Sequence, residues 1–124
     1  MSKPHKIVIL EDDRILLKAL NIELLSNGFE VLSAADGESG LKLIGKEKPD
    51  LVLLDLVMPK MHGFEVLTKL KKNKDTENIP IIILSNLGQD EEIKKGMDLG
   101  ALDYYKKAST DLSELSDKIK KTLS

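Results

Sequence analysis

Acidic side chains directly follow two apolar runs in this sequence, and their types could support metal chemistry. Glu11, Asp12 and Asp13 come directly after the run 7–10, and Asp55 comes directly after the run 51–54. Carboxylates that lie close together repel one another, so a fold that gathers them needs a compensating cation. Oxygen ligands without histidine or cysteine suit Mg²⁺, which often completes its shell with water and a phosphate. We therefore predict a magnesium and phosphoryl site.

Other polar side chains follow two further apolar runs. Ser85 and Asn86 end the run 81–84, and Lys106 and Lys107 end a segment that begins near residue 102. A hydroxyl can hydrogen-bond phosphoryl oxygens, and an ammonium group can neutralise them. These residues extend the predicted site if all the segments end at one edge.

A simpler interpretation is that Asp13 caps a helix and that Glu11 and Asp12 are solvated loop acids. We accept this interpretation for Asp13 alone. It does not explain Asp55, because an acid directly after four apolar strand residues would be costly to bury without a partner. The two histidines, His5 and His62, are predicted to be surface residues and not metal ligands.

The elements that must position these residues alternate between strands and helices. Apolar residues at helical spacing follow each apolar run. Asn27-Gly28 is a signal that ends a helix, and Asp111 with Glu114 has the spacing of a capping box that begins one. The predicted strands are 7–10, 30–34, 51–54, 81–84 and 102–106, and the better-defined helices are 62–72, 90–99 and 112–123.

Five such strand and helix pairs with short connections predict right-handed crossovers and a doubly wound α/β fold. The sheet is expected to be parallel, with five strands and five helices. A chain of 124 residues is long enough for one domain, which we place at residues 1–124. Ligands of such sheets bind at the carboxyl ends of the strands, where the acids are expected.

Composition limits the partners. A net charge of −2 gives no strong field toward nucleic acid or anionic lipid, so we expect no direct binding to nucleic acid and none to membranes. The chain has no cysteine and no run long enough to span a membrane, which makes the cytoplasm the expected location. A basic cluster at a predicted helix end, Lys69, Lys71, Lys72 and Lys74, is interpreted as a solvated face.

These motifs together resemble the receiver domain of bacterial two-component response regulators, of the stand-alone, chemotaxis-regulator-like kind. The resemblance spans nearly the whole chain and implies a flavodoxin-like fold. Its segments, in order, are Glu11-Asp12 after the first strand, Asp55 with Met58-Pro59 after the third, Ser85 after the fourth, and Gly100-Ala101 through Lys107 around the fifth.

The resemblance implies a specific role for each acid. Asp55 would be the phosphoacceptor, and Asp12, Asp55 and the backbone carbonyl of Val57 would ligate Mg²⁺. Glu11 would act on the metal through water.

The resemblance also implies a switch. Ser85 would hydrogen-bond the phosphoryl oxygens and Lys107 would pair with them, and Tyr104 would follow the state of Ser85. Lys106 makes the choice of lysine less certain, but adjacent strand residues face opposite sides, and spacing from Gly100 favours Lys107.

The implied function is a signalling switch, phosphorylated by a sensor histidine kinase or phosphotransfer protein, that changes its binding to a downstream protein. Such a protein would catalyse only its own phosphorylation and dephosphorylation, so we do not expect an enzyme in the usual sense. We expect a monomer or weak dimer. A receiver-like scaffold that binds partners without phosphorylation is the alternative.

Departures from the family pattern keep that alternative open. Ala108 stands where a proline, often cis, usually follows the lysine, and we predict a trans bond because a cis bond before a non-proline residue costs about 2.5–4 kcal/mol. Asn86 stands where a smaller residue is usual and could hinder phosphodonors. Two other classes fit less well: a haloacid-dehalogenase-like phosphohydrolase needs an aspartate where Val57 stands, and a dinucleotide-binding domain needs a glycine-rich loop in place of Glu11-Asp12.

Overall fold

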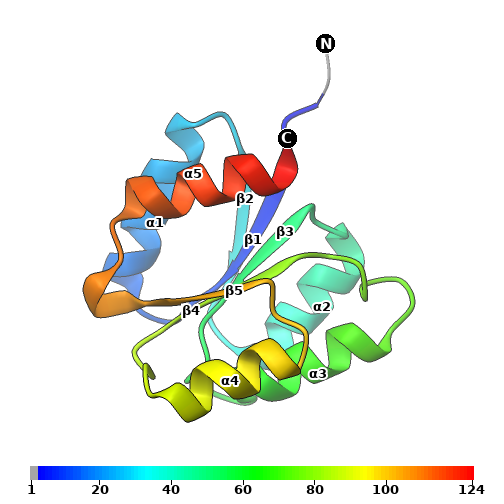
Figure 1. The fold of residues 1–124 in the computed structure, drawn as a ribbon. Coiled ribbons are helices and arrows are strands. Elements are labelled where there is room, and N and C mark those ends of the chain that lie inside the picture. The colour runs from blue at the N-terminus through cyan, green and yellow to red at the C-terminus, as the bar shows by residue number, and fades with distance from the viewer. Residues whose placement is uncertain (1–2) are drawn as a thin grey trace.

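The computed structural model describes residues 3–124 as one twisted parallel sheet flanked by helices (Figure 1). The strand order is β2-β1-β3-β4-β5. The chain therefore places β2 on one side of β1 and then adds β3, β4 and β5 in succession on the other side. The strands are β1 (Lys6–Leu10), β2 (Glu30–Ala34), β3 (Leu51–Leu54), β4 (Ile81–Ser85) and β5 (Asp103–Lys106). The predicted doubly wound α/β fold is confirmed.

Four α-helices connect successive strands, a fifth follows β5, and together they cover both faces of the sheet. Helices α1 and α5 lie on one face, and α2, α3 and α4 lie on the other (Figure 1). The helices are α1 (Arg14–Ser26), α2 (Gly37–Glu47), α3 (Gly63–Lys72), α4 (Asp90–Asp98) and α5 (Leu112–Leu123), and a short 3₁₀ turn spans Lys107–Ser109.

The central strands consist of apolar residues because both of their faces are covered. All residues of β3 and β4 are buried, and so are residues 7–10 of β1. Alternate side chains enter two separate apolar clusters. Val8 and Leu10 pack toward α2 and α3, whereas Ile7 and Ile9 pack toward α1 and α5. The edge strands β2 and β5 are only partly buried, as expected for strands with one free edge.

Side-chain caps fix where several helices begin. Asp13 accepts hydrogen bonds from the N–H groups of Ile15 and Leu16, which confirms its predicted capping role. Asp111 accepts from Ser113 N–H at the start of α5. The first strand is thus followed within three residues by a fixed helix start, which leaves Glu11 and Asp12 in a short, restrained connection.

Two further expectations concern the backbone and the membrane. Residues 3–124 contain no cis peptide bond, so the predicted trans bond between Lys107 and Ala108 is confirmed. Within the same range no helix has both the length and the apolar character that crossing a membrane requires.

Candidate functional site

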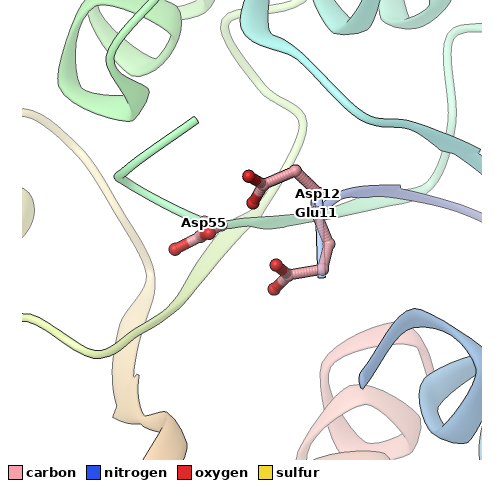
Figure 2. A group of neighbouring side chains, drawn as sticks. All are labelled: Glu11, Asp12 and Asp55. Atoms are coloured by element: carbon pink, nitrogen blue, oxygen red, sulfur yellow. The ribbon is translucent and has the colours of Figure 1, made fainter. Parts of the chain in front are cut away.

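Three acidic side chains meet at the carboxyl ends of β1 and β3. These strands are paired neighbours, with Leu10 opposite Leu54, so the residues that follow them are adjacent. Figure 2 shows Glu11 and Asp12 at one strand end and Asp55 at the next. One carboxylate oxygen from each of the three lies within 4.8 Å of the others. The structure therefore brings together the acids that the sequence singled out.

Burial differs within this cluster. The relative exposure of Glu11 is 2% and that of Asp55 is 5%, whereas Asp12 is exposed. One oxygen of Asp55 accepts a hydrogen bond from Leu56 N–H at 2.8 Å, and Glu11 accepts one from Asp13 N–H at 3.0 Å. Backbone donors hold both buried carboxylates in place.

Lys107 reaches this cluster from the end of β5. Its Nζ lies 2.8 Å from Glu11 Oε1 and 3.1 Å from Asp55 Oδ2. The neighbouring Lys106 has an exposed side chain and takes no part in these contacts. Burial disfavours the charged ammonium, but the bonds to Glu11 and Asp55 outweigh burial and raise the pKa of Lys107. Lys107 is therefore a permanent cation at neutral pH.

One lysine does not compensate three carboxylates. Burial raises the pKa of Glu11, although the Lys107 ammonium and the Asp13 N–H both act to lower it. The negative charge of Asp55 adds to this rise. The cluster is therefore short of positive charge.

Asp12 and Asp55 border a hollow with a volume of about 200 Å³. Its lining combines carboxylates, a hydroxyl, an amide and an ammonium group: Asp12, Asp13, Asp55, Val57, Ser85, Asn86 and Lys107. The donor set is made of hard oxygen atoms, which fits a divalent cation of the Mg²⁺ or Ca²⁺ type. The hollow also has room for a small anionic group beside such an ion.

The hydroxyl groups of Ser85 and Tyr104 both contact the loop between β4 and α4. Ser85 is fully buried at the end of β4, and its Oγ accepts a hydrogen bond from Leu87 N–H at 3.2 Å. Tyr104, on the adjacent strand β5, donates its hydroxyl hydrogen to the carbonyl oxygen of Leu87. Burial raises the pKa of Tyr104, so the phenol remains a donor at neutral pH. Both backbone groups of Leu87 are therefore occupied by residues predicted to form a switch.

Val57 and Asn86 are placed at the rim of the site. Val57 directly follows Asp55 and Leu56, and its side chain is 58% exposed. Asn86 is also exposed, and both residues line the same hollow. The predicted roles of the Val57 carbonyl as a ligand and of Asn86 as an obstacle remain predictions.

The sequence interpretation missed two residues outside the site. Lys71 was assigned to a solvated basic face, but its Nζ donates to the carbonyl oxygens of Glu77 and Ile79 at 3.0 Å and 2.9 Å. It therefore holds the connection between α3 and β4. His62 is exposed, as predicted, and its Nδ1 also accepts from Phe64 N–H at 3.0 Å to cap α3. The Lys71 contacts have no signal in the local sequence, whereas the His62 cap joins residues two positions apart at the start of a predicted helix.

Comparison with known proteins agrees with this geometry. Residues 7–120 match the family described as the response regulator receiver domain. The chain is 38% identical over 119 residues to the probable transcriptional regulator ycf27 of Porphyridium aerugineum, which covers 96% of this chain and 48% of that protein. It is 36% identical over 118 residues to the DNA-binding dual master transcriptional regulator RpaA of Synechocystis, with 95% and 48% covered.

Solved structures agree as well. A putative response regulator from Chloroflexus aurantiacus superposes with a TM-score of 0.91 and 31% identity, with 98% of each chain covered. The BeF3-activated N-terminal receiver domain of RstA from Klebsiella pneumoniae superposes with a TM-score of 0.88 and 30% identity, with 95% of this chain and 97% of that chain covered.

The named relatives correct one expectation. Both curated relatives named above are called transcriptional regulators, and RpaA is called DNA-binding, which contradicts the expectation of no direct nucleic-acid partner. The chain spans about half the length of these curated relatives. The expectation failed because the net charge describes only the region that was matched, and it says nothing of DNA contacts made elsewhere in such proteins. The match over residues 7–120 and the identities above show that this chain belongs to the receiver domain family of response regulators.

Proposed function

We propose that this chain is a phosphorylation-dependent signalling switch with Asp55 as the phosphoacceptor. The observation that carries the proposal is the setting of the Asp55 carboxylate. It is buried, held by Leu56 N–H and paired with Lys107, and it borders the hollow that Ser85 also lines. A carboxylate in this setting is an oriented nucleophile with a cation and a hydroxyl positioned for the incoming phosphoryl oxygens.

The acids fit a resident Mg²⁺ ion. Asp12, Asp55 and the backbone carbonyl of Val57 would hold it, and Glu11 would act through water. When bound, the ion would neutralise charge on the phosphoryl oxygens and orient the group for in-line transfer. The excess of carboxylates over ammonium groups supports this part of the proposal.

The donor would be a phosphohistidine on a sensor histidine kinase or phosphotransfer protein. An oxygen of Asp55 forms a bond to phosphorus, the bond from phosphorus to the imidazole nitrogen breaks, and the neutral imidazole leaves after protonation. Lys107 Nζ stabilises the charge on the transferring group. The product is an acyl phosphate, which water later hydrolyses, so the protein would turn over no substrate other than itself. Such donors are made from ATP, which supports a cytoplasmic location.

The signal would pass through the loop after β4. Phosphorylation adds nearly two negative charges and three strong acceptors. Ser85 Oγ would turn to donate to a phosphoryl oxygen and would leave Leu87 N–H without its acceptor. Tyr104, which is bonded to Leu87 O, would respond, and the partner-binding face would change. The names of the relatives support control of transcription as the output of a whole protein of this kind.

Intact-mass spectrometry after incubation with Mg²⁺ and acetyl phosphate tests the proposal. The parent should gain one phosphoryl group, and Asp55→Asn should gain none. Glu47→Gln, a carboxylate change at the opposite end of the sheet, is the matched control and should be modified like the parent. A parent that stays unmodified would favour the alternative, a scaffold that binds partners without phosphorylation. An Asp55→Asn variant that is modified equally would exclude Asp55 as the phosphoacceptor.

Calorimetric titration with Mg²⁺ tests the metal separately. Asp12→Asn should weaken Mg²⁺ binding by roughly tenfold or more, because it removes an anionic ligand from a site that keeps few protein ligands. Glu47→Gln should leave the affinity unchanged. Equal affinities for the parent and Asp12→Asn would exclude Asp12 as a ligand.

A further inference from the structure

The loop between β4 and α4 has a third restraint in addition to Ser85 and Tyr104. Gly88 lies directly under the aliphatic part of Lys106. A Cβ atom added at Gly88 would lie 2.8 Å from Cδ, 2.9 Å from Cε and 3.1 Å from Cγ of Lys106. The first two separations are shorter than real carbon contacts and the third is unusually tight, so the lysine methylene groups cover the glycine backbone closely.

The position of Lys106 in the sheet explains this contact. Lys106 is the last residue of β5 and is paired with Ser85, the last residue of β4. The next residue, Lys107, reaches the carboxylates, and strand alternation sends Lys106 to the other side, over the loop. The carbonyl oxygen of Lys106 also accepts a hydrogen bond from the Thr110 hydroxyl at 2.5 Å, which holds the base of the side chain in place.

The three restraints act on adjacent residues. Ser85 Oγ holds Leu87 N–H, Tyr104 holds Leu87 C=O, and Lys106 covers Gly88. If Ser85 turns toward a phosphoryl group, the first restraint is lost. The loop can then rearrange only as far as the other two allow, so packing at Gly88 adds to the cost of leaving this conformation.

We propose that Lys106 is a positioning residue whose methylene stem, and not its charge, stabilises the conformation of the loop between β4 and α4 seen here. By doing so it opposes the rearrangement that accompanies phosphorylation. This inference rests on the proposed function for its effect on phosphorylation, but its effect on the loop itself is independent of that function.

Two substitutions at position 106 separate stem from charge. Lys106→Met keeps atoms at the γ, δ and ε positions that cover Gly88 and removes the ammonium group, whereas Lys106→Ala removes both. Hydrogen exchange of the Leu87 and Gly88 amides, followed by NMR without Mg²⁺ or phosphodonor, measures opening of the loop. We expect exchange to rise about threefold to tenfold in Lys106→Ala and to stay near the parent value in Lys106→Met.

Phosphorylation gives the second readout. The rate of modification by acetyl phosphate at saturating Mg²⁺ should rise by a similar factor in Lys106→Ala and return to the parent rate in Lys106→Met. Gly88→Ala should reproduce the effect of Lys106→Ala, because the new Cβ displaces the stem. The double variant should show no further increase, since both changes remove one contact.

Three outcomes would overturn the proposal: equal exchange in all variants, equal increases in Lys106→Ala and Lys106→Met, or additive effects of Gly88→Ala and Lys106→Ala. The second outcome would assign the effect to charge. If neither the parent nor any position-106 or position-88 variant is phosphorylated, the proposed function fails, and the amide exchange data still decide the role of Lys106. The far-ultraviolet circular dichroism and urea midpoint of each variant establish that it is folded.

Discussion

A lysine contacts carboxylates at both ends of the sheet, and the two clusters behave differently. At the amino ends of the strands, Lys6 Nζ lies 2.9 Å from Glu47 and 3.8 Å from Glu30, and Asp50 accepts the Lys6 backbone N–H at 2.7 Å. These side chains remain in contact with water. The hydrogen bond from Lys6 lowers the pKa of Glu47 and stabilises its charged form.

At the carboxyl ends, the charges of Lys107, Glu11 and Asp55 are withdrawn from water, and only Asp12 is exposed. Lys107 contacts Glu11 as closely as Lys6 contacts Glu47, yet burial raises the pKa of Glu11. Both clusters have a lysine contact, so the difference comes first from the burial of Glu11 and then from the neighbouring charge of Asp55. At the amino ends, water solvates the carboxylate charge that Lys6 does not balance. At the carboxyl ends an added cation would have to balance the excess charge, which is why the cluster is suited to a ligand site and its counterpart is not.

Removing each lysine in turn should separate the two clusters most clearly. Lys107→Ala should lower the free energy of unfolding by about 3 kcal/mol at pH 7 without Mg²⁺, because it leaves two buried carboxylates without a cationic partner. Lys6→Ala should have a much smaller effect, since water replaces its ammonium. Urea denaturation followed by circular dichroism measures both.

Saturating Mg²⁺ is the control for this experiment. A bound cation should recover part of the stability of Lys107→Ala and should leave Lys6→Ala unchanged. Equal losses in the two variants would show that solvation does not distinguish the clusters.

The pH dependence of stability should have opposite signs at the two ends. The pKa of Glu11 is raised by burial, so its contribution to stability is fully present below the unfolded value of 4.5 and is lost as pH rises through the folded pKa. The pKa of Glu47 is lowered by Lys6, so its contribution is present above 4.5 and is lost as pH falls through the folded pKa.

Two substitutions make this difference measurable. Without Mg²⁺, Glu11→Gln should become more stable relative to the parent as pH rises from about 4 to 7. Over the same range Glu47→Gln should become less stable relative to the parent. Unfolding free energies at several pH values test this, and slopes of the same sign would contradict the roles given to burial and to the Lys6 contact.

The sequence allowed the acidic cluster to be predicted because its determinants are local. Apolar runs marked the buried strands, and the strands 30–34 and 51–54 were predicted with the bounds that the structure has. Parallel pairing then forced the residues after β1 and β3 together. The position of Asp55 directly after a buried strand was enough to assign it to the acidic cluster, whereas its role as phosphoacceptor came from the family resemblance.

Contacts made by long side chains between elements were not predictable in this way. Lys71 looked like one member of a basic cluster, but its position against the segment 77–79 depends on how α3 packs. The packing of Lys106 on Gly88 depends in the same way on the loop after β4. Flexible side chains can reach several partners, and only the assembled fold selects among them.

The smallest expected difference between the ends concerns the backbone. A lysine with positive φ lies near each cluster: Lys60 (φ 69°) in the connection that follows Asp55, and Lys48 (φ 45°) at the end of α2. A non-glycine residue in this left-handed region destabilises the folded state by about 1–2 kcal/mol. Glycine removes this strain, but its greater freedom in the unfolded state offsets part of the gain in stability. Lys60→Gly and Lys48→Gly should therefore each stabilise the protein by about 0.5–1 kcal/mol.

Urea denaturation of both variants measures the gain, and the acetyl phosphate reaction shows whether it has a cost. If the two ends differ in solvation and not in strain, the gains should be equal and Lys60→Gly should be phosphorylated at the parent rate. A gain confined to Lys48→Gly, or slower phosphorylation of Lys60→Gly alone, would mean that the left-handed residue after Asp55 holds the site in shape. The carboxyl ends would then differ from the amino ends in backbone restraint as well as in access to water.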